Sequence, residues 1–281
     1  MSEVEARLAA EMKRVQAAEE DSAAFLSAVD HLEASEAKAA AAPITHDSVE
    51  ARHRRAMELA RSGNWEAALP ELLWCYDEGM VRVSEFRGVR VSFLLGELAQ
   101  IAQNYPPAMA ALEERRGKAF QRMEVNLLDW EASRDYLSIN RALGRSAETL
   151  SYYDSLAPTD RRRGALGEGV YDLLVDSRRY ADAVAAKPYS RIVGDFERMV
   201  SPFTDKNAMT TMSDAQRTEA RRSVAKSAAE NVEALAGAGA LAQASELAAK
   251  ILTVDNSEET RRELLRRLER AGHADLLAGT K

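Results

Sequence analysis

The four histidines are the first residues to examine for metal binding, because neutral imidazole is a common metal ligand. His46 and His53 are seven residues apart, about two helical turns, so one helix could carry both on the same face. His46, however, precedes the residues expected to begin that helix, and no third ligand stands nearby in the sequence. His31 and His273 are isolated. Because zinc sites use three or four ligands at characteristic spacings, the sequence predicts no metal site.

The sequence patterns that accompany other kinds of catalysis are also missing. Nucleophilic catalysis requires a nucleophile, a base and an orienting group. The chain has no G-x-S-x-G motif, and its single cysteine, Cys75, lies in the apolar run 72–76 without a Cys–His signature. Residues 164–170 (GALGEGV) lack the Gly-Lys-Ser/Thr motif of a phosphate loop, so we expect a helix start or kink there. We predict no catalytic residues and no cofactor, and therefore a protein that is not an enzyme.

The charged residues indicate which partners to expect. The chain has 38 Lys and Arg against 45 Asp and Glu, a net charge of −7, whereas nucleic-acid binders usually carry a basic stripe. Arginine clusters at 161–163, 221–222 and 261–270 could hold an acidic peptide or a phosphate backbone. Acidic residues such as Glu258 and Glu263 are interleaved with the last cluster, which favours local ion pairs on a solvated face. We therefore expect no nucleic-acid partner.

The elements that position these residues are predicted to be helices. No stretch shows sustained strand alternation, and one spacing recurs in four segments: a small or apolar pair, a Gly or polar break, then an aromatic or apolar residue and a small one. The clearest copy is Ala56, Leu59, Gly63, Trp65, Ala68 and Leu72. The others are Gly96, Ala99, Gln103, Tyr105, Ala108 and Leu112; Tyr171, Leu174, Arg178, Tyr180 and Ala183; and Val232, Leu235, Gly239, Leu241, Ala244 and Ala248. This is the spacing of a repeated helix–turn–helix unit, so we predict an all-α fold, an α-solenoid of stacked antiparallel helix pairs.

Over roughly residues 47–281 the chain resembles the tetratricopeptide repeat family, most strongly at residues 56–72. In that family the first helix of each pair lines a concave surface, and the resemblance implies the same here. The lining would be Glu50, His53, Met57 and Arg61 from the first pair; Arg90, Phe93, Glu97 and Gln100 from the second; and Glu131, Arg134, Ser138 and Arg141 from the third. Family members that clamp a C-terminal carboxylate use Lys and Asn at such positions, and these are absent here. The mixed lining suits an extended peptide of mixed charge; alternatively, these residues form a solvated inner face or pack on the N-terminal arm.

Composition and turn signals divide the chain into four parts. Residues 1–42 are predicted to form an N-terminal helical arm or linker, and residues 43–187 the helix pairs that resemble tetratricopeptide repeats (TPR-like pairs). Residues 188–213 are predicted to be an irregular insertion with a short helix over 190–200, and residues 214–281 the C-terminal helix pairs and cap.

Several residues are predicted to start or end these helices. Asp47 or Ser48 is expected to cap the first helix, Ser84 a helix over 85–103, and Ser213 or Asp214 a long helix to about Ala236. Turns are expected at Gly63, Gly144 and Gly272, and Gly79 is expected to stop the second helix, which begins at Trp65.

These patterns lead to three hypotheses about function. The first is a non-catalytic protein–protein interaction scaffold or adaptor that binds a partner protein or peptide in a concave groove, because stacked helix pairs usually bind rather than catalyse. The second is a regulatory sensor of a small peptide or metabolite, and the third an enzyme whose site is not visible in sequence. We expect a cytoplasmic protein without a membrane partner, because no apolar run reaches the roughly 18 residues of a membrane span. Self-association through the N-terminal arm is a further possibility.

Overall fold

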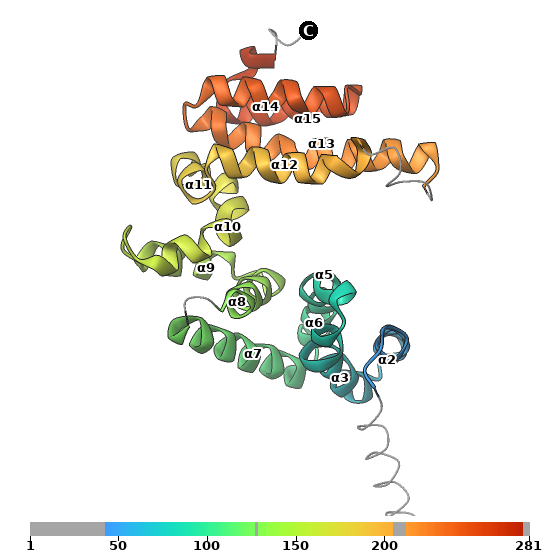
Figure 1. Cartoon of the computed structure of the whole chain (residues 1–281). Helices are drawn as coiled ribbons and strands as arrows, with labels where there is room; N and C mark the ends of the chain where they lie inside the picture. Colours follow the sequence, from blue (N-terminus) through green and yellow to red (C-terminus); the bar gives the residue numbers. More distant parts are fainter. Residues whose placement is uncertain (1–42, 127–128, 205–211, 278–281) are drawn as a thin grey trace, which may run out of the picture. The chain divides into compact units, whose positions relative to one another are not determined.

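The computed structural model describes residues 43–126, 129–204 and 212–277, and every regular element in these ranges is helical (Figure 1). The predicted all-α class is therefore confirmed for the described part of the chain.

The chain divides into two compact units, one ending at Arg87 and the other beginning at Gly88. No sequence pattern indicated this boundary, and the four parts predicted from composition stay predictions. The predicted arm, residues 1–42, lies outside the described residues.

The first unit contains the predicted first helix pair, α2 (His46–Arg61) and α3 (Trp65–Trp74), which pack on each other. The Thr45 hydroxyl accepts a hydrogen bond from the Ser48 N–H, and the Ser48 hydroxyl accepts one from the Thr45 N–H. This reciprocal capping box satisfies two amides that the first helical turn leaves free. The helix therefore begins before the Asp47–Ser48 pair that was predicted to cap it.

The sequence predicted that the helix beginning at Trp65 would stop at Gly79, but the helix continues past this residue. It continues through a π-helical turn (Cys75–Gly79) into α4 (Met80–Arg82). Gly79 is buried against the ring of Trp74, and a Cβ at this position would collide with the indole. Gly79 therefore allows close packing and does not end the helix.

The predicted helix over residues 85–103 forms in several pieces. A 3-10 turn (Ser84–Phe86) is followed by α5 (Arg87–Val89), a π-helical turn (Arg90–Leu94) and α6 (Leu95–Ala102). Ser84 does not cap the helix as predicted, because its hydroxyl donates to the Glu85 carboxylate at 2.9 Å.

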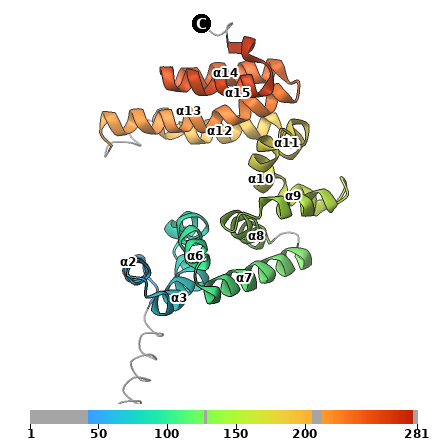
Figure 2. The same cartoon turned by 180° about the vertical axis from the view of Figure 1, so that it is seen from behind.

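The second unit continues as a succession of helices that mostly pack on their neighbours in the chain (Figures 1 and 2). They are α7 (Pro106–Val125), α8 (Trp130–Ala142), α9 (Ser146–Ser155), α10 (Arg161–Asp176), α11 (Tyr180–Ala186), α12 (Tyr189–Thr204), α13 (Asp214–Gly237), α14 (Leu241–Val254) and α15 (Glu258–Ala271), followed by a 3-10 turn (Ala274–Leu277). The neighbours α6 and α7, α7 and α8, α10 and α11, and α13 and α14 pack on each other. In addition, α8 packs on α10, and α13 packs on α11 and α15.

The turns inside the helix pairs share one geometry. Positive φ angles, from 57° to 81°, occur at Gly63, Gly144, Arg178, Gly239 and Gly272. At each turn, the residue that follows the positive-φ residue donates its N–H to the carbonyl of the residue five positions earlier in the chain. At Gly63, for example, the Asn64 N–H donates to the Leu59 carbonyl at 2.9 Å. This is the Schellman ending, which favours glycine because it requires a left-handed residue. The turns predicted at Gly63, Gly144 and Gly272 are confirmed, whereas the break at Gln103 has an ordinary helical φ of −63°.

A small residue is fully buried five positions after the turns at Gly63, Arg178 and Gly239, namely Ala68, Ala183 and Ala244, and Ala108 stands at the same distance from the break at Gln103. In the third pair this position holds Thr149, which is also buried. Its hydroxyl accepts a hydrogen bond at 3.0 Å from the amide of Asn140, the polar residue that stands where an apolar one is expected. The side-chain oxygen (Oδ1) of Asn140 accepts a hydrogen bond from Nε of Arg116 at 2.5 Å. A hydrogen-bonded pair therefore replaces an apolar pair in this core.

The segment predicted to be an irregular insertion is helical over most of its length. The expected short helix over 190–200 is confirmed, but α12 runs from Tyr189 to Thr204 and contains Pro202. Ile192 and Phe196 of this helix are buried in the same cluster as apolar residues of α13 and α14, and Val200 packs against that cluster. Residues 205–211 lie outside the described residues.

A buried charged cluster joins α11, α13 and α15. Glu233 on α13 is fully buried and pairs with Arg267 at 2.9 Å and with Arg270 at 3.1 Å. It also accepts a hydrogen bond from the Tyr180 hydroxyl at 3.0 Å. Arg270 donates to the carbonyl of Asp176 at 2.6 Å. Arg270 thus caps the Asp176 carbonyl at the end of α10, next to carbonyls that the Schellman turn at Arg178 already satisfies.

Candidate functional site

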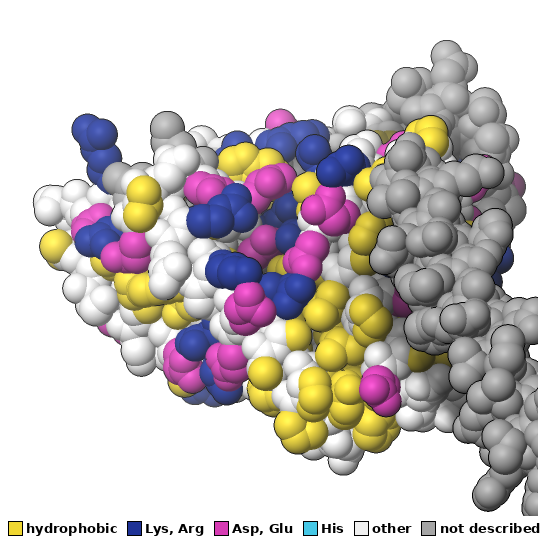
Figure 3. Space-filling model, turned by 90° about the horizontal axis from the view of Figure 1, so that it is seen from below, with side chains coloured by type: hydrophobic (Ala, Val, Ile, Leu, Met, Phe, Trp, Pro, Cys, Tyr) yellow, Lys and Arg dark blue, Asp and Glu magenta, His cyan; other side chains and the backbone are white. Residues whose placement is uncertain are grey.

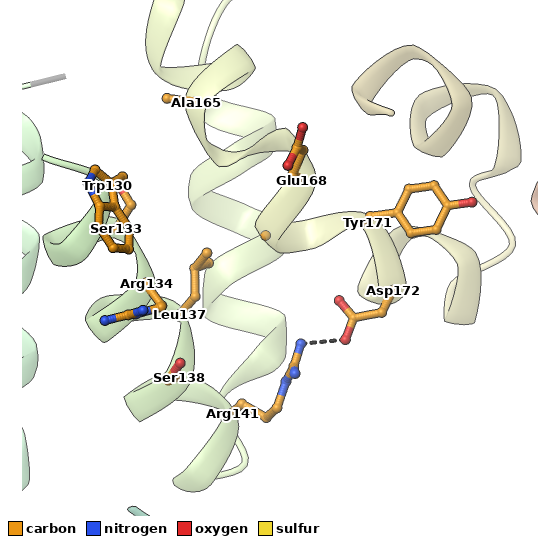
Figure 4. A pocket seen from close by; sticks show the side chains of 11 residues that line it. Trp130, Ser133, Arg134, Leu137, Ser138, Arg141, Ala165, Glu168, Tyr171 and Asp172 are labelled. Carbon is orange, nitrogen blue, oxygen red and sulfur yellow. Dashed lines mark hydrogen bonds and ion pairs between the residues drawn. The ribbon is translucent and has the colours of Figure 1, made fainter. Parts of the chain in front are cut away.

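A groove of about 510 Å³ lies between α8 and α10, which are the first helices of the predicted third and fourth pairs (Figure 4). Its lining residues from α8 are Trp130, Ser133, Arg134, Leu137, Ser138 and Arg141, and those from α10 are Ala165, Glu168, Gly169, Tyr171 and Asp172.

Glycines on α10 determine how closely its neighbours approach. The stretch 164–170, where a helix start or kink was expected, lies within α10, which begins three residues earlier at Arg161. A Cβ at Gly169 would collide with the Leu137 side chain of α8, and a Cβ at Gly167 would lie 3.1 Å from that of Ala186 on α11. These two glycines let α8 and α11 pack directly against the α10 backbone.

Trp130 and Arg134 form one side of the groove. They are separated by one helical turn of α8, and the guanidinium carbon of Arg134 lies 4.9 Å from the centre of the indole ring. Trp130 remains 57% exposed. A cation over an aromatic face is attracted by the ring quadrupole, so the indole holds the guanidinium in place while one apolar surface stays open to solvent.

The other charged side chains of the groove are neutralised within the unit. Arg141 on α8 pairs with Asp172 on α10 across the groove, as the dashed line in Figure 4 marks. Glu168 pairs with Arg191 on α12 at 3.0 Å. In the part of the chain that the structure describes, Arg134 has no carboxylate partner, and its buried Nε–H has no hydrogen-bond acceptor. The groove therefore carries one uncompensated positive charge.

Tyr171 contributes to the lining but directs its hydroxyl elsewhere. In Figure 4 its ring points away from the other labelled side chains. Burial raises the pKa of its phenol, and the carboxylates of Glu230 and Glu233 raise it further. The amine of Lys187 lies 5.4 Å from the ring centre. Tyr171 is thus a core residue whose phenol stays protonated at neutral pH.

Three of the four residues predicted from the third pair, Arg134, Ser138 and Arg141, line this groove. Glu131 is half-buried and is not part of the lining. From the second pair, Phe93 is 76% exposed on the π-helical turn, Gln100 is exposed and Glu97 is half-buried. Whether any of them contacts a partner stays a prediction.

Two residues predicted to face the groove are buried instead. Arg90 is directed inward, because its guanidinium donates two hydrogen bonds to Asp135 of α8 at 2.6 and 2.8 Å. Met57 lies in the core of the first unit. Of the other residues predicted from the first pair, Glu50 and Arg61 are exposed and His53 is half-buried.

Sequence reasoning missed Trp130, Glu168 and Asp172 as parts of the site. A local signal existed for Trp130, because an aromatic and an arginine four residues apart share one face of a helix. No local signal existed for Asp172, whose partner Arg141 is 31 positions away in the chain.

Several chemical functions find no support in the described residues. They contain no group of three His, Cys, Asp or Glu side chains arranged to hold a metal ion. Cys75 is buried, and burial raises the pKa of its thiol to about 11, which keeps it protonated at neutral pH. Nor do these residues include a helix with both the length and the apolar character to cross a membrane.

Positive and negative side chains are intermixed on the face of the molecule that Figure 3 shows. In the face shown in Figure 3, the Lys and Arg side chains lie among Asp and Glu side chains and do not form a basic stripe.

Comparison of the chain with protein-family models, curated proteins and solved structures found no match.

Proposed function

We propose that this protein is a non-catalytic interaction scaffold that binds an extended segment of a partner protein in the groove between α8 and α10. The observation that carries the proposal is the exposed indole of Trp130, held beside a guanidinium on the rim of a groove. Trp and Arg are the side chains that most often dominate the binding energy of protein interfaces.

The recurring helix pairs support the architecture that this function requires. Schellman turns recur within four of the pairs, each followed five positions later by a buried small residue. Such pairs are the units from which α-solenoids are stacked. We propose that they form a tetratricopeptide-like solenoid in which first helices, here α8 and α10, line the binding surface.

A small-molecule sensor is the second candidate, because the groove volume of about 510 Å³ is within the range of ligand pockets. A ligand that binds only the folded state raises the midpoint of thermal unfolding. A metabolite that raises the Tm of the wild type, but not that of a Trp130→Ala variant, would favour the sensor over the scaffold.

Photo-cross-linking tests the scaffold proposal. Benzoylphenylalanine is placed at Ser138 in the groove or, as a control, at Lys226, which is exposed on α13 and does not line the groove. In lysate of the producing cells, we expect a partner to be cross-linked from position 138 and not from position 226. The purified partner should then bind a Trp130→Ala variant at least about tenfold more weakly, a loss of about 1.4 kcal/mol. Equal binding to the variant and to the wild type would refute the groove as the site.

A further inference from the structure

The charge balance of the α8–α10 groove indicates what its ligand carries. The net charge of each of the ion pairs Arg141–Asp172 and Glu168–Arg191 is zero. Arg134 is half-buried, and no carboxylate in the described residues pairs with it. Partial burial weakens the solvation of its guanidinium, so an anion that binds there restores interactions that water supplies to an exposed arginine.

The arrangement also favours a particular kind of anion. The guanidinium is positioned by Trp130, so little side-chain freedom is lost when a planar carboxylate pairs with it. The exposed indole next to it offers an apolar or aromatic ligand side chain a surface for stacking. A carboxylate and a ring carried on one peptide would use both features.

The spacing along α8 gives the expected spacing in the ligand. Trp130 and Arg134 are one turn apart, which corresponds to a rise of about 6 Å along the helix. An extended peptide rises about 3.3 Å per residue. Two side chains about two residues apart in the ligand therefore reach Arg134 and Trp130 together.

We propose that the groove selects peptides in which an Asp or Glu lies about two residues from an aromatic or large apolar residue. The acidic side chain pairs with Arg134 and the apolar one stacks on Trp130. This inference rests on the proposed function and adds the chemistry of the partner segment to it. Basic segments are disfavoured, because they would bring a like charge to the guanidinium.

Selection from a random dodecapeptide library displayed on phage tests the inference. The peptides are fused at their C-terminus, so that only side-chain carboxylates are available. Selections use the wild type, Arg134→Gln, Trp130→Ala, and Lys226→Gln as a control that removes one exposed positive charge elsewhere. Wild type and Lys226→Gln should both enrich an acidic residue about two positions from an aromatic.

The variants separate this inference from the function on which it rests. Arg134→Gln should keep the aromatic preference, lose the acidic one, and bind the peptides selected by the wild type about tenfold more weakly. Peptides that depend on Trp130 but show no acidic enrichment, or that bind Arg134→Gln normally, would overturn the inference and leave the groove as the site. Peptides that bind all variants equally, or a selection that enriches nothing, would overturn both.

Discussion

Asn140 and Thr149 are a buried polar pair at positions where other helix pairs carry apolar residues. The equivalent residues are Leu174 and Ala183 in the fourth pair, and Leu235 and Ala244 in the pair formed by α13 and α14. The polar pair persists because each member has a partner: Thr149 accepts from Asn140, and Asn140 accepts from Arg116. A buried polar group destabilises the fold mainly when its partner is removed.

The first prediction follows from this pairing. Asn140→Leu should lower the free energy of unfolding by about 1 to 3 kcal/mol, because it leaves the buried hydroxyl of Thr149 without its donor. The double variant Asn140→Leu/Thr149→Ala recreates the apolar pair of the other units and should recover most of that loss. Urea unfolding of the single and double variants measures the coupling. A double variant that loses as much stability as the two single losses combined would contradict the argument.

Two glutamates in α13 and α15 should respond to pH in opposite directions. Hydrogen bonds from Arg266 and Arg267 lower the pKa of Glu263, so its ionised form stabilises the fold above its ordinary pKa of about 4.3, and this contribution is lost as the pH falls. Burial raises the pKa of Glu230, so ionisation of this side chain opposes folding at neutral pH.

The second prediction uses this pair of glutamates as mutual controls. Glu263→Gln should reduce stability at pH 7 by about 1 kcal/mol and have a smaller effect at pH 3. Glu230→Gln should increase stability at pH 7 and change little at pH 3. Denaturant midpoints measured at both pH values test the signs. The interpretation fails if both substitutions shift stability in the same direction at pH 7.

At the scale of helices and turns, the repeated left-handed residue explains how the pairs reverse direction. Gly239 joins α13 to α14 with a φ of 81°, a conformation that a side chain disfavours. Gly117, by contrast, lies exposed in the interior of α7, and a Cβ there would meet nothing within 4 Å. Two chemically identical substitutions should therefore have opposite effects.

The third prediction compares these two glycines. Gly239→Ala should destabilise the protein by about 1 kcal/mol, because alanine disfavours the left-handed conformation. Gly117→Ala should stabilise it by about 0.5 to 1 kcal/mol, because alanine loses less backbone entropy in a helix. Thermal unfolding followed by circular dichroism measures both changes. Two losses, or two gains, would show that backbone conformation does not control these sites.

The same elements show which features the sequence could predict. Turns such as Gly63 and Gly144 were predictable because glycine and helical periodicity are local signals. The π-helical turn at residues 90–94 was not, because its geometry accompanies the buried pair between Arg90 and Asp135, which are 45 positions apart. In the candidate site, Arg134, Ser138 and Arg141 on α8 were named through the resemblance to tetratricopeptide repeats, whereas the α10 residues depended on how the two helices pack.

At the scale of the whole chain, the division after Arg87 separates segments of very different capacity to fold alone. The described part before it, residues 43–87, is about the size below which domains usually need disulfides, metals or partners. The part from Gly88 onward contains two large hydrophobic clusters. One of these joins residues from Ala119 on α7 to Ala234 on α13.

The fourth prediction concerns fragments. A fragment of residues 88–281 should remain helical and unfold cooperatively in urea, because it keeps both clusters intact. A control fragment of residues 161–281 loses the members of the first cluster that lie on α7, α8 and α9, and should bind the dye ANS and unfold over a broad range. Circular dichroism and ANS fluorescence test both. A shorter fragment as cooperative as the longer one would place the boundary elsewhere.

The contact between Arg270 and the end of α10 links two positions 94 residues apart. Most other helix contacts join neighbours in the chain, so early helix pairs can assemble soon after they leave the ribosome. The Schellman turn at Arg178 forms from local residues, but the Asp176 carbonyl receives its side-chain donor from Arg270, which is translated almost a hundred residues later. At about 5 to 20 residues per second, several seconds pass before that cap exists. During this interval the nascent chain can hold a formed α8 beside an α10 whose Asp176 carbonyl still faces water, so the end of α10 acquires its contact with α15 only after that helix has been made.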